Sequence, residues 1–217
     1  AGIDAGAVYL EPVAKNTAAA IAVGALAVVK DDPDGVMVVM PSDHVIGDAA
    51  AFAKAVEKAA RVAATGRLVL FGIKPSEAHT GYGYIRQGAS IPGGEAFAVD
   101  AFFEKPDAET AAGYLKSGNY FWNSGIFVLH ARTFIEELSR LQPTILGAAR
   151  SALAAAQPDL GCIRLDRDAF AASPNISVDY AVMEKTSLAA MLPLDVGWND
   201  VGSWPSLWEV APHDKHR

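Results

Sequence analysis

Apolar runs alternate with helix-forming stretches over the first third of this 217-residue chain, and this alternation limits the possible folds most strongly. Strands are expected at Val8–Leu10, Val36–Met40 and Leu68–Ile73. Helices are expected between them, one capped by Asn16-Thr17 and running to about Lys30, the next from about Ala49 to Ala64. Strand, helix, strand, helix, strand is the pattern of a parallel α/β sheet. We therefore predict an α/β fold.

The run Val36–Met40 is apolar at every position, which predicts a strand covered on both faces. Gly66 marks the end of the second helix. The later part of the chain continues the mixture, with a loop or hairpin over 87–95. Further strands are expected at 97–103, 126–129 and 188–194, and helices at 107–116, 132–141, 144–156, 177–183 and 204–210. We find no repeat, linker or composition break, so residues 1–217 are expected to form one domain.

Composition excludes several classes of protein. Hydrophobic residues make up 51% of the chain, enough for a substantial core. The net charge of −7 argues against nucleic-acid binding. The single cysteine, Cys162, excludes an internal disulfide framework and a cysteine-based zinc site. No uncharged apolar run reaches membrane-spanning length and no signal peptide precedes the first strand, so we expect a cytoplasmic protein without a membrane partner.

Two acidic motifs are candidate metal sites. Pro41-Ser42-Asp43-His44 directly follows an expected strand, and ligands in α/β sheets bind beyond the carboxyl ends of strands. Asp43 is therefore placed to hold a divalent cation such as Mg²⁺, although Ser42 or Asp43 could instead cap the next helix. His44 alone favours a hydrogen-bonded loop residue over a ligand.

The second acidic motif is Gly197-Trp198-Asn199-Asp200-Val201-Gly202-Ser203-Trp204, which holds two of the four tryptophans of the chain. Asp200 places a carboxylate in a glycine-containing loop with a tryptophan on each side in the sequence, and this combination suits a metal or sugar site. The alternative is a tight turn whose tryptophans fill the core.

Three further motifs suit sugar or phosphate. Gly81 and Gly83 flank a tyrosine and would let backbone amides approach a ligand, unless they mark a bulge. Glu104 and Lys105 end a strand; adjacent strand residues point oppositely, so we expect no pairing between them. One would accept from sugar hydroxyls and the other would meet phosphate, unless both are solvated. Asn123, in a Trp-Asn-Ser-Gly segment before a strand, would bind hydroxyls or make a turn.

One motif suits a purine base. Glu11, between a strand and a helix start, offers a carboxylate to the two adjacent N–H donors of guanine's Watson–Crick edge. Asn16 and Thr17 follow it, and each could instead be a helix cap that needs no ligand.

Taken in order, these motifs resemble one family. Glu-Pro-x-x-Lys-Asn-Thr, Pro-Ser-Asp-His, Gly-Tyr-Gly-Tyr-Ile, Phe-x-Glu-Lys-Pro, Trp-Asn-Ser-Gly, Asp-Tyr-Ala-Val-Met-Glu-Lys and Gly-Trp-x-Asp-Val-Gly-Ser-Trp follow one another from Glu11 to about Asp214. This series resembles the mannose-1-phosphate guanylyltransferases, within the sugar-phosphate nucleotidylyltransferases. The resemblance implies a Rossmann-like nucleotidyltransferase fold, with a mixed, mainly parallel sheet flanked by helices.

The resemblance also implies a reaction and a set of residues. The family joins mannose 1-phosphate and GTP into GDP-mannose and pyrophosphate, using Mg²⁺. By resemblance, Asp43 and Asp200 hold the metal and Lys105 contacts the sugar phosphate. Glu104 and Asn123 match positions that hold mannose hydroxyls, with backbone at Gly81 and Gly83. Glu11, Asn16 and Thr17 lie in the segment that recognises the guanine base in the family.

Departures from the family pattern add expectations. The family's Gly-Gly-x-Gly-x-Arg-Leu-x-Pro loop, which grips the triphosphate, has no counterpart here, and Ala14-Lys15 stands where Gly-Arg is usual. The resemblance thus implies an N-terminally incomplete fold, little or no GTP turnover by this chain alone, and possible homo-oligomers. The end at Arg217 leaves out the isomerase domain that some relatives carry. Alternatives are a glucose-1-phosphate uridylyl- or thymidylyltransferase, a non-catalytic sugar-nucleotide-binding or regulatory module, and a fragment of an ordinary enzyme.

Overall fold

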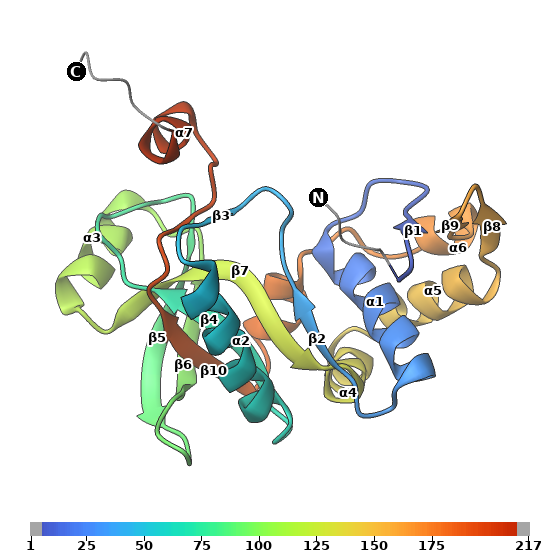
Figure 1. Cartoon of the computed structure of the whole chain (residues 1–217), viewed down its shortest axis with the longest axis horizontal. Coiled ribbons are helices and arrows are strands. Elements are labelled where there is room, and N and C mark those ends of the chain that lie inside the picture. The colour runs from blue at the N-terminus through green and yellow to red at the C-terminus, as the bar shows by residue number, and fades with distance from the viewer. Residues whose placement is uncertain (1–5, 212–217) are drawn as a thin grey trace. The chain divides into compact units, whose positions relative to one another are not determined.

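The computed structural model describes residues 6–211 (Figure 1). The last residues of the motif series, up to Asp214, lie outside this range. The chain divides into two compact units, one formed by 1–37 and 130–186 and the other by 38–129 and 187–217. Each unit is built from two separate stretches of sequence. None of the described helices combines the length and apolar character needed to cross a membrane.

The first unit is mainly helical. Its helices are α1 (Thr17–Asp31), α4 (Ala131–Leu141), α5 (Pro143–Ala154), α6 (Arg167–Ala171) and a π-helical turn, η1 (Asp179–Met183). Helix α1 contacts both α4 and α5. Its small side chains, among them Ala18, Ala22 and Ala25, are fully buried, so the helix backbones approach closely.

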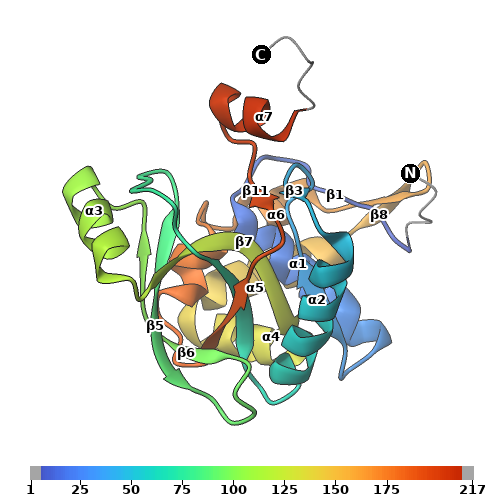
Figure 2. The same ribbon diagram turned by 60° about the vertical axis from the view of Figure 1, so that its left-hand side comes forward.

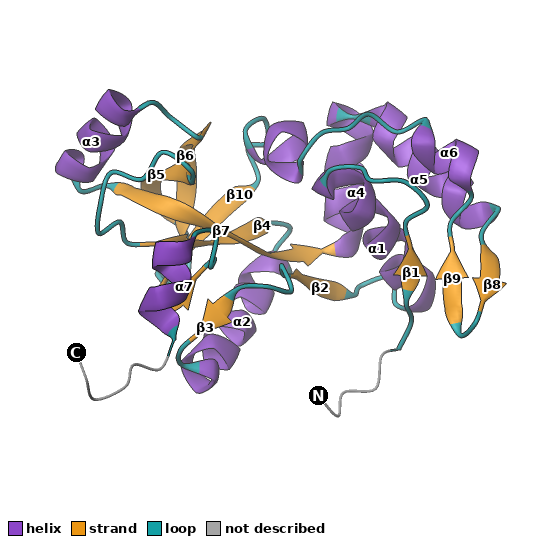
Figure 3. Cartoon of the chain, turned by 90° about the horizontal axis from the view of Figure 1, so that it is seen from above, coloured by secondary structure: helices purple, strands orange, loops and turns teal. Residues whose placement is uncertain are grey.

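A small three-stranded sheet completes the first unit. The strands lie in the order β1 (Tyr9–Leu10), β9 (Cys162–Arg164), β8 (Gln157–Asp159), side by side in Figure 3. The first pairing is parallel and the second is a hairpin. The predicted strand at Val8–Leu10 is therefore present, but it does not belong to the large sheet.

The large sheet has the strand order β2-β7-β4-β10-β6-β5. Strand β2 (Val36–Val39) contains the boundary between the two units, and β7 (Tyr120–His130) ends one residue beyond the other boundary. The remaining strands all belong to the second unit: β4 (Leu68–Ile73), β5 (Gly83–Ser90), β6 (Phe97–Glu104) and β10 (Ala189–Leu194). The hairpin expected over 87–95 joins β5 to β6.

The sheet is mixed, but the prediction that it is mainly parallel is wrong. Strands β4 and β10 pair in parallel, whereas β4–β7, β10–β6, β5–β6 and β5–β7 are antiparallel. The strand–helix alternation that suggested parallel crossovers stops at Ile73. Beyond it, a hairpin and a returning long strand carry the chain back, and both connections reverse the strand direction.

Burial of β2 also differs from the expectation. Val36, Val38 and Met40 are 37%, 40% and 50% exposed, whereas the intervening Met37 and Val39 are half-buried. An unbroken apolar run predicts burial of both faces only where layers cover both, and β2 stands at the end of the strand order. By contrast, β4 lies between two strands and is almost wholly buried.

Helix α2 (Ala49–Ala63) lies along the sheet of the second unit (Figure 2). Its buried Ala59 and Ala63 share a core with alternate residues of the central strands, such as Val69, Phe71 and Leu192. Helices α3 (Ala108–Ser117) and α7 (Trp204–Val210) complete the unit. Helix α7 stands away from the sheet in Figures 1 and 2, and its Trp204 is 84% exposed.

Candidate functional site

A two-stranded ribbon in the second unit brings the two acidic motifs together. Strand β3 (Val45–Ile46) pairs antiparallel with β11 (Trp198–Asn199), with Asn199 opposite Val45. Asp43 lies two residues before the first strand and Asp200 directly follows the second, so both carboxylates stand at the same end of the ribbon. The sequence analysis predicted neither of these short strands.

His44 lies close enough to both Asp43 and Asp200 for their charges to affect its pKa. Burial lowers the pKa of the His44 imidazole below its ordinary value, while the charges of Asp43 and Asp200 act in the opposite direction. Both carboxylates therefore act on one ring. The indole Nε1–H of Trp198 donates to His44 Nδ1 over 3.1 Å, and the two rings meet edge to face. This bond restricts the orientation of the imidazole ring.

Asp200 is held by two donors. The hydroxyl of Tyr82 donates to Asp200 Oδ1 over 2.8 Å, and the backbone N–H of Gly202 donates to the same oxygen over 3.1 Å. Val201, which lies between Asp200 and Gly202 in the sequence, has φ = 52°, a left-handed conformation that is rare for a β-branched residue. Its N–H donates to Asn199 Oδ1 over 2.7 Å. The loop is thus fixed in one strained shape around the carboxylate.

Aromatic rings surround Tyr82. His79 stacks on it with ring centroids 3.9 Å apart, and Trp122 and Trp198 meet it edge to face at 5.0 and 5.6 Å. Such contacts restrict the rotation of the tyrosine ring. They also place the indole of the second acidic motif against the Gly-Tyr-Gly segment.

Glu104, Asn123 and Gly83 meet on neighbouring strands. Gly83 pairs with Glu104 across β5 and β6. A Cβ atom at Gly83 would lie 2.5 Å from Glu104 Oε2 and 3.4 Å from the Asn123 Cβ. Glycine is therefore required for this carboxylate to lie where it does. Asn123 is inside the long strand β7 and not in a turn before a strand, and its Oδ1 accepts from the Gly125 N–H over 3.2 Å.

Glu104 and Lys105 do form an ion pair, at 3.6 Å between Oε1 and Nζ, so the prediction that they would not pair is wrong. Strand β6 ends at Glu104, and Lys105 has φ = 50°. The side-chain alternation of the strand therefore stops between the two residues. The Lys105 N–H donates to the Tyr82 carbonyl over 3.3 Å, which ties this turn to the Gly-Tyr-Gly segment.

Gly81 lies at the other side of Tyr82. Its N–H donates to His79 Nδ1 over 3.1 Å, and a Cβ atom there would meet the His79 ring at 2.8 Å. Seven of the ten predicted site residues therefore belong to the second unit: Asp43, Gly81, Gly83, Glu104, Lys105, Asn123 and Asp200.

The predicted guanine-reading residues belong to the first unit. Burial raises the pKa of the Glu11 carboxyl, although much of the residue is exposed. Asn16 caps α1: its Oδ1 accepts from the Thr17 N–H, and its own N–H donates to Asn175 Oδ1. The Thr17 hydroxyl accepts from the Val178 N–H over 2.9 Å. The alternative interpretation of Asn16 and Thr17 as structural residues thus has direct support.

The donor set near Asp200 fits a hard cation. Carboxylate oxygens are the ligands Mg²⁺ takes from proteins, usually one or two per site, with waters and substrate phosphates completing the shell. Among residues 6–211 no group of three or more His, Cys, Asp or Glu side chains could hold a metal by itself. A cation held by two carboxylates in this part of the chain would therefore need further ligands, such as waters and phosphate oxygens.

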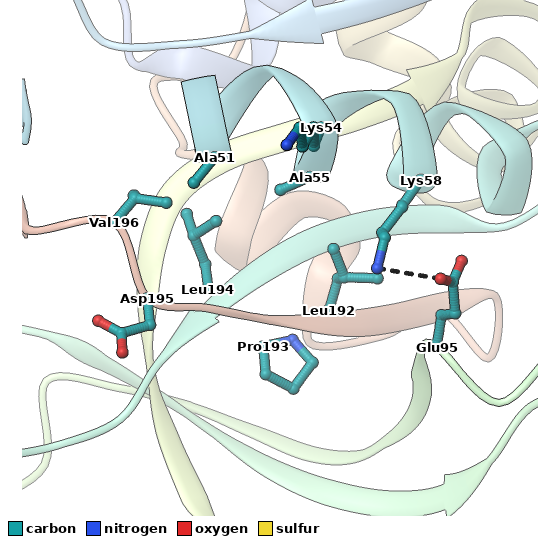
Figure 4. Close-up of a pocket in the computed structure, with 10 residues that line it drawn as sticks. All are labelled: Ala51, Lys54, Ala55, Lys58, Glu95, Leu192, Pro193, Leu194, Asp195 and Val196. Carbon is teal, nitrogen blue, oxygen red and sulfur yellow. Dashed lines mark ion pairs between the residues drawn. The ribbon is translucent and has the colours of Figure 1, made fainter. Parts of the chain in front are cut away.

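A separate cavity of about 350 Å³ lies between α2 and β10 (Figure 4). Leu192, Leu194 and Ala55 contribute apolar side chains, and an ion pair of 3.0 Å between Lys58 and Glu95 lies at its edge. None of the predicted site residues lines this cavity.

Comparison with known proteins establishes the family. The nucleotidyl transferase family model matches residues 5–217. The chain belongs to the nucleotidyl transferase family. XanB, a xanthan biosynthesis protein of Xanthomonas campestris pv. campestris (strain B100), is 53% identical over 213 residues, 98% of this chain and 45% of that protein. The mannose-1-phosphate guanylyltransferase of Escherichia coli (strain K12) is 50% identical over 211 residues, 95% of this chain and 44% of that enzyme.

A solved structure with a similar fold supports this family assignment. A protein of Thermus thermophilus, described as a mannose-1-phosphate geranyltransferase, superposes with a TM-score of 0.81 at 33% identity, over 96% of this chain and 58% of that one. The predicted mixed α/β nucleotidyltransferase fold is confirmed. This nucleotidyl transferase chain spans less than half the length of the curated relatives named above.

The sequence motifs did not predict two residues that hold this candidate site in shape, Tyr82 and His79. The sequence marks Tyr82 only as the tyrosine between two glycines. Its hydrogen bond to Asp200 joins residues that are 118 positions apart in the sequence. His79 is not among the predicted site residues. The one signal in the sequence was the unusual density of aromatic residues in the two motifs, which turn out to pack against each other.

Proposed function

We propose that this chain carries the catalytic domain of a mannose-1-phosphate guanylyltransferase, which forms GDP-mannose and pyrophosphate from mannose 1-phosphate and GTP with Mg²⁺. Relatives with this activity in their names share about half of the chain's residues over nearly its whole length. This identity is the observation that carries the proposal. The clustering of Asp43 with Asp200, and of Glu104 with Asn123, supports it.

The chemistry needs no general base. The phosphate of a sugar phosphate has a second pKa of about 6 and is largely dianionic at neutral pH. One of its oxygens attacks the α-phosphorus of GTP, that bond forms as the bond to the leaving oxygen breaks, and pyrophosphate departs with the electron pair. The protein's task is to position two anions and offset their repulsion.

Each proposed residue has one role. Lys105 places its ammonium group by the sugar phosphate. Glu104 and Asn123 accept from and donate to mannose hydroxyls, at a place where Gly83 leaves room. Asp43 and Asp200 hold Mg²⁺, which when bound would neutralise phosphate charge. The backbone at Gly81 and Gly83 lines the sugar, and Glu11, with Asn16 and Thr17, reads guanine.

Binding tests the proposal without requiring turnover by a chain that spans less than half of its relatives. GDP-mannose is titrated calorimetrically into the chain with Mg²⁺ and with EDTA, beside UDP-glucose and dTDP-glucose. We expect GDP-mannose to bind at least tenfold more tightly than either, and EDTA to weaken it at least tenfold, about 1.4 kcal/mol. Asp43→Asn and Asp200→Asn should reproduce the EDTA effect.

Preference for UDP-glucose or dTDP-glucose would favour the uridylyl- or thymidylyltransferase alternative, and no binding at all would contradict the proposal. A parallel assay of pyrophosphate release from GTP and mannose 1-phosphate separates an enzyme from a non-catalytic binding module. The expectation of little or no turnover by this chain alone stays a prediction that the same assay measures.

A further inference from the structure

Tyr82 forms hydrogen bonds with two of the proposed catalytic residues, one between its hydroxyl and the Asp200 carboxylate and one between its carbonyl and the backbone of Lys105. Its hydroxyl donates to Asp200 Oδ1 over 2.8 Å, and its carbonyl accepts from the Lys105 N–H over 3.3 Å. Asp200 and Lys105 are 95 residues apart in sequence and belong to different motifs. Tyr82 therefore connects the carboxylate of Asp200 to the backbone of the turn that carries Lys105.

The bond to Asp200 selects one carboxylate oxygen. Both hydrogen bonds described for this carboxylate, from the Tyr82 hydroxyl and the Gly202 N–H, end on Oδ1. Neither uses Oδ2, so that oxygen keeps its lone pairs for a cation. A carboxylate fixed at one oxygen has lost its rotation about the Cβ–Cγ bond before any ligand arrives, which lowers the entropy lost on binding.

The backbone on both sides of these bonds is strained. Lys105 and Val201 have φ values of 50° and 52°, and they are two of the three described non-glycine residues with positive φ. Lys105 also precedes a proline, Pro106, which ordinarily demands an extended conformation. Such conformations persist only where the surroundings hold them. Each of the two strained residues lies next to a hydrogen bond of Tyr82.

The tyrosine is itself held. His79 stacks on its ring with centroids 3.9 Å apart, and Trp122 and Trp198 contact the ring edge to face. We call these three rings the aromatic box. The ring therefore keeps its place without the hydroxyl, which makes the hydroxyl's contribution separable by experiment.

We propose that Tyr82 is a positioning residue that presents Asp200 Oδ2 to the metal ion and anchors the turn that carries Lys105. The inference rests on the proposed function, because it assumes that Asp200 is a metal ligand. Removing a partner that orients a metal ligand lowers metal affinity by about 10- to 100-fold in proteins. The hydroxyl of Tyr82 is expected to have an effect of this size.

The test compares Tyr82→Phe with Tyr84→Phe in the full chain. Phenylalanine keeps the ring in the aromatic box and removes only the hydroxyl. Tyr84 is a matched control two residues along the chain: it is fully buried, and its hydroxyl donates to the His79 carbonyl over 2.9 Å, not to Asp200. Mn²⁺ binding in the presence of GDP-mannose is measured by electron paramagnetic resonance, and mannose 1-phosphate binding with EDTA is measured by calorimetry.

We expect Tyr82→Phe to weaken Mn²⁺ binding at least tenfold while mannose 1-phosphate affinity changes less than threefold, because the carbonyl bond to Lys105 remains. Tyr84→Phe should leave both affinities within threefold. A general loss of structure would lower both affinities in Tyr82→Phe, and that result would overturn the inference, as would unchanged Mn²⁺ binding.

Asp200→Asn separates this inference from the function on which it rests. If Asp200→Asn weakens Mn²⁺ binding and Tyr82→Phe does not, the positioning role alone is wrong. If the wild-type chain and Asp200→Asn bind Mn²⁺ equally, the metal role of Asp200 is wrong, and the inference is overturned with it.

Discussion

At the scale of single residues, the space left by Gly83 decides where Glu104 can lie. A methyl group at Gly83 would stand 2.5 Å from Glu104 Oε2 and 3.3 Å from the Phe102 ring, so the carboxylate must move. We expect Gly83→Ala to weaken binding of mannose 1-phosphate about tenfold, or 1.4 kcal/mol, as measured by calorimetry. Gly113→Ala in α3 is the control, because a methyl group there meets nothing within 4 Å. It should raise stability by roughly 0.5–1 kcal/mol and leave binding unchanged. Equal affinities of the two variants would show that Glu104 does not contact the sugar phosphate.

At the scale of elements, a buried carboxylate joins α4 to the segment after η1. Glu137 is 8% exposed, and it accepts two bonds from Arg140, at 2.9 and 2.8 Å, and one from the Thr186 hydroxyl at 2.5 Å. Hydrogen bonding by Arg140 lowers the pKa of the Glu137 carboxyl below its ordinary 4.5, against the effect of burial. A lowered folded-state pKa means that the charged form stabilises the fold above about pH 4.5, and that this contribution is lost as pH falls through the folded pKa.

Glu137→Gln should therefore lower the free energy of unfolding by roughly 1–3 kcal/mol at pH 7, and the difference from wild type should shrink towards pH 3. Urea unfolding followed by circular dichroism at both pH values measures this. The exposed neighbour Glu136 is the matched control, and Glu136→Gln should change stability by less than about 0.5 kcal/mol at either pH. A Glu137→Gln effect that is independent of pH would show that the charge is not responsible.

At the scale of the whole molecule, we expect the two units to unfold as one domain, because the chain passes between them three times, at 37/38, 129/130 and 186/187. The sequence supplies a probe for each unit. All four tryptophans belong to the second unit, and the single cysteine, Cys162, belongs to the first. Tryptophan fluorescence and thiol labelling of Cys162 should give urea midpoints that coincide within error, as a two-state transition requires. Two separate midpoints would divide the chain into two independently stable domains.

Local sequence patterns predicted most of the helices and longer strands, because capping residues and apolar periodicity act over a few residues. Helix α1 begins at the residue that Asn16 caps, and α2 and α5 lie within two residues of their predicted bounds. The short strands β3 and β11 could not be predicted, because two residues carry no period. Their pairing depends on chain segments more than 150 residues apart.

The motif residues were identified from the sequence alone, since their order along the chain carries the family resemblance. Which of them meet was decided by the tertiary structure. The bond from Tyr82 to Asp200 and the edge position of β2 depend on a strand arrangement that local sequence does not encode. The ion pair between Glu104 and Lys105 depends on the positive φ of Lys105 at the end of β6, which the strand pattern did not predict. Residue types and their spacing thus determined the chemistry available to this protein. The sheet decided which groups could act together, because hydrogen bonds and ion pairs form only over a few ångströms.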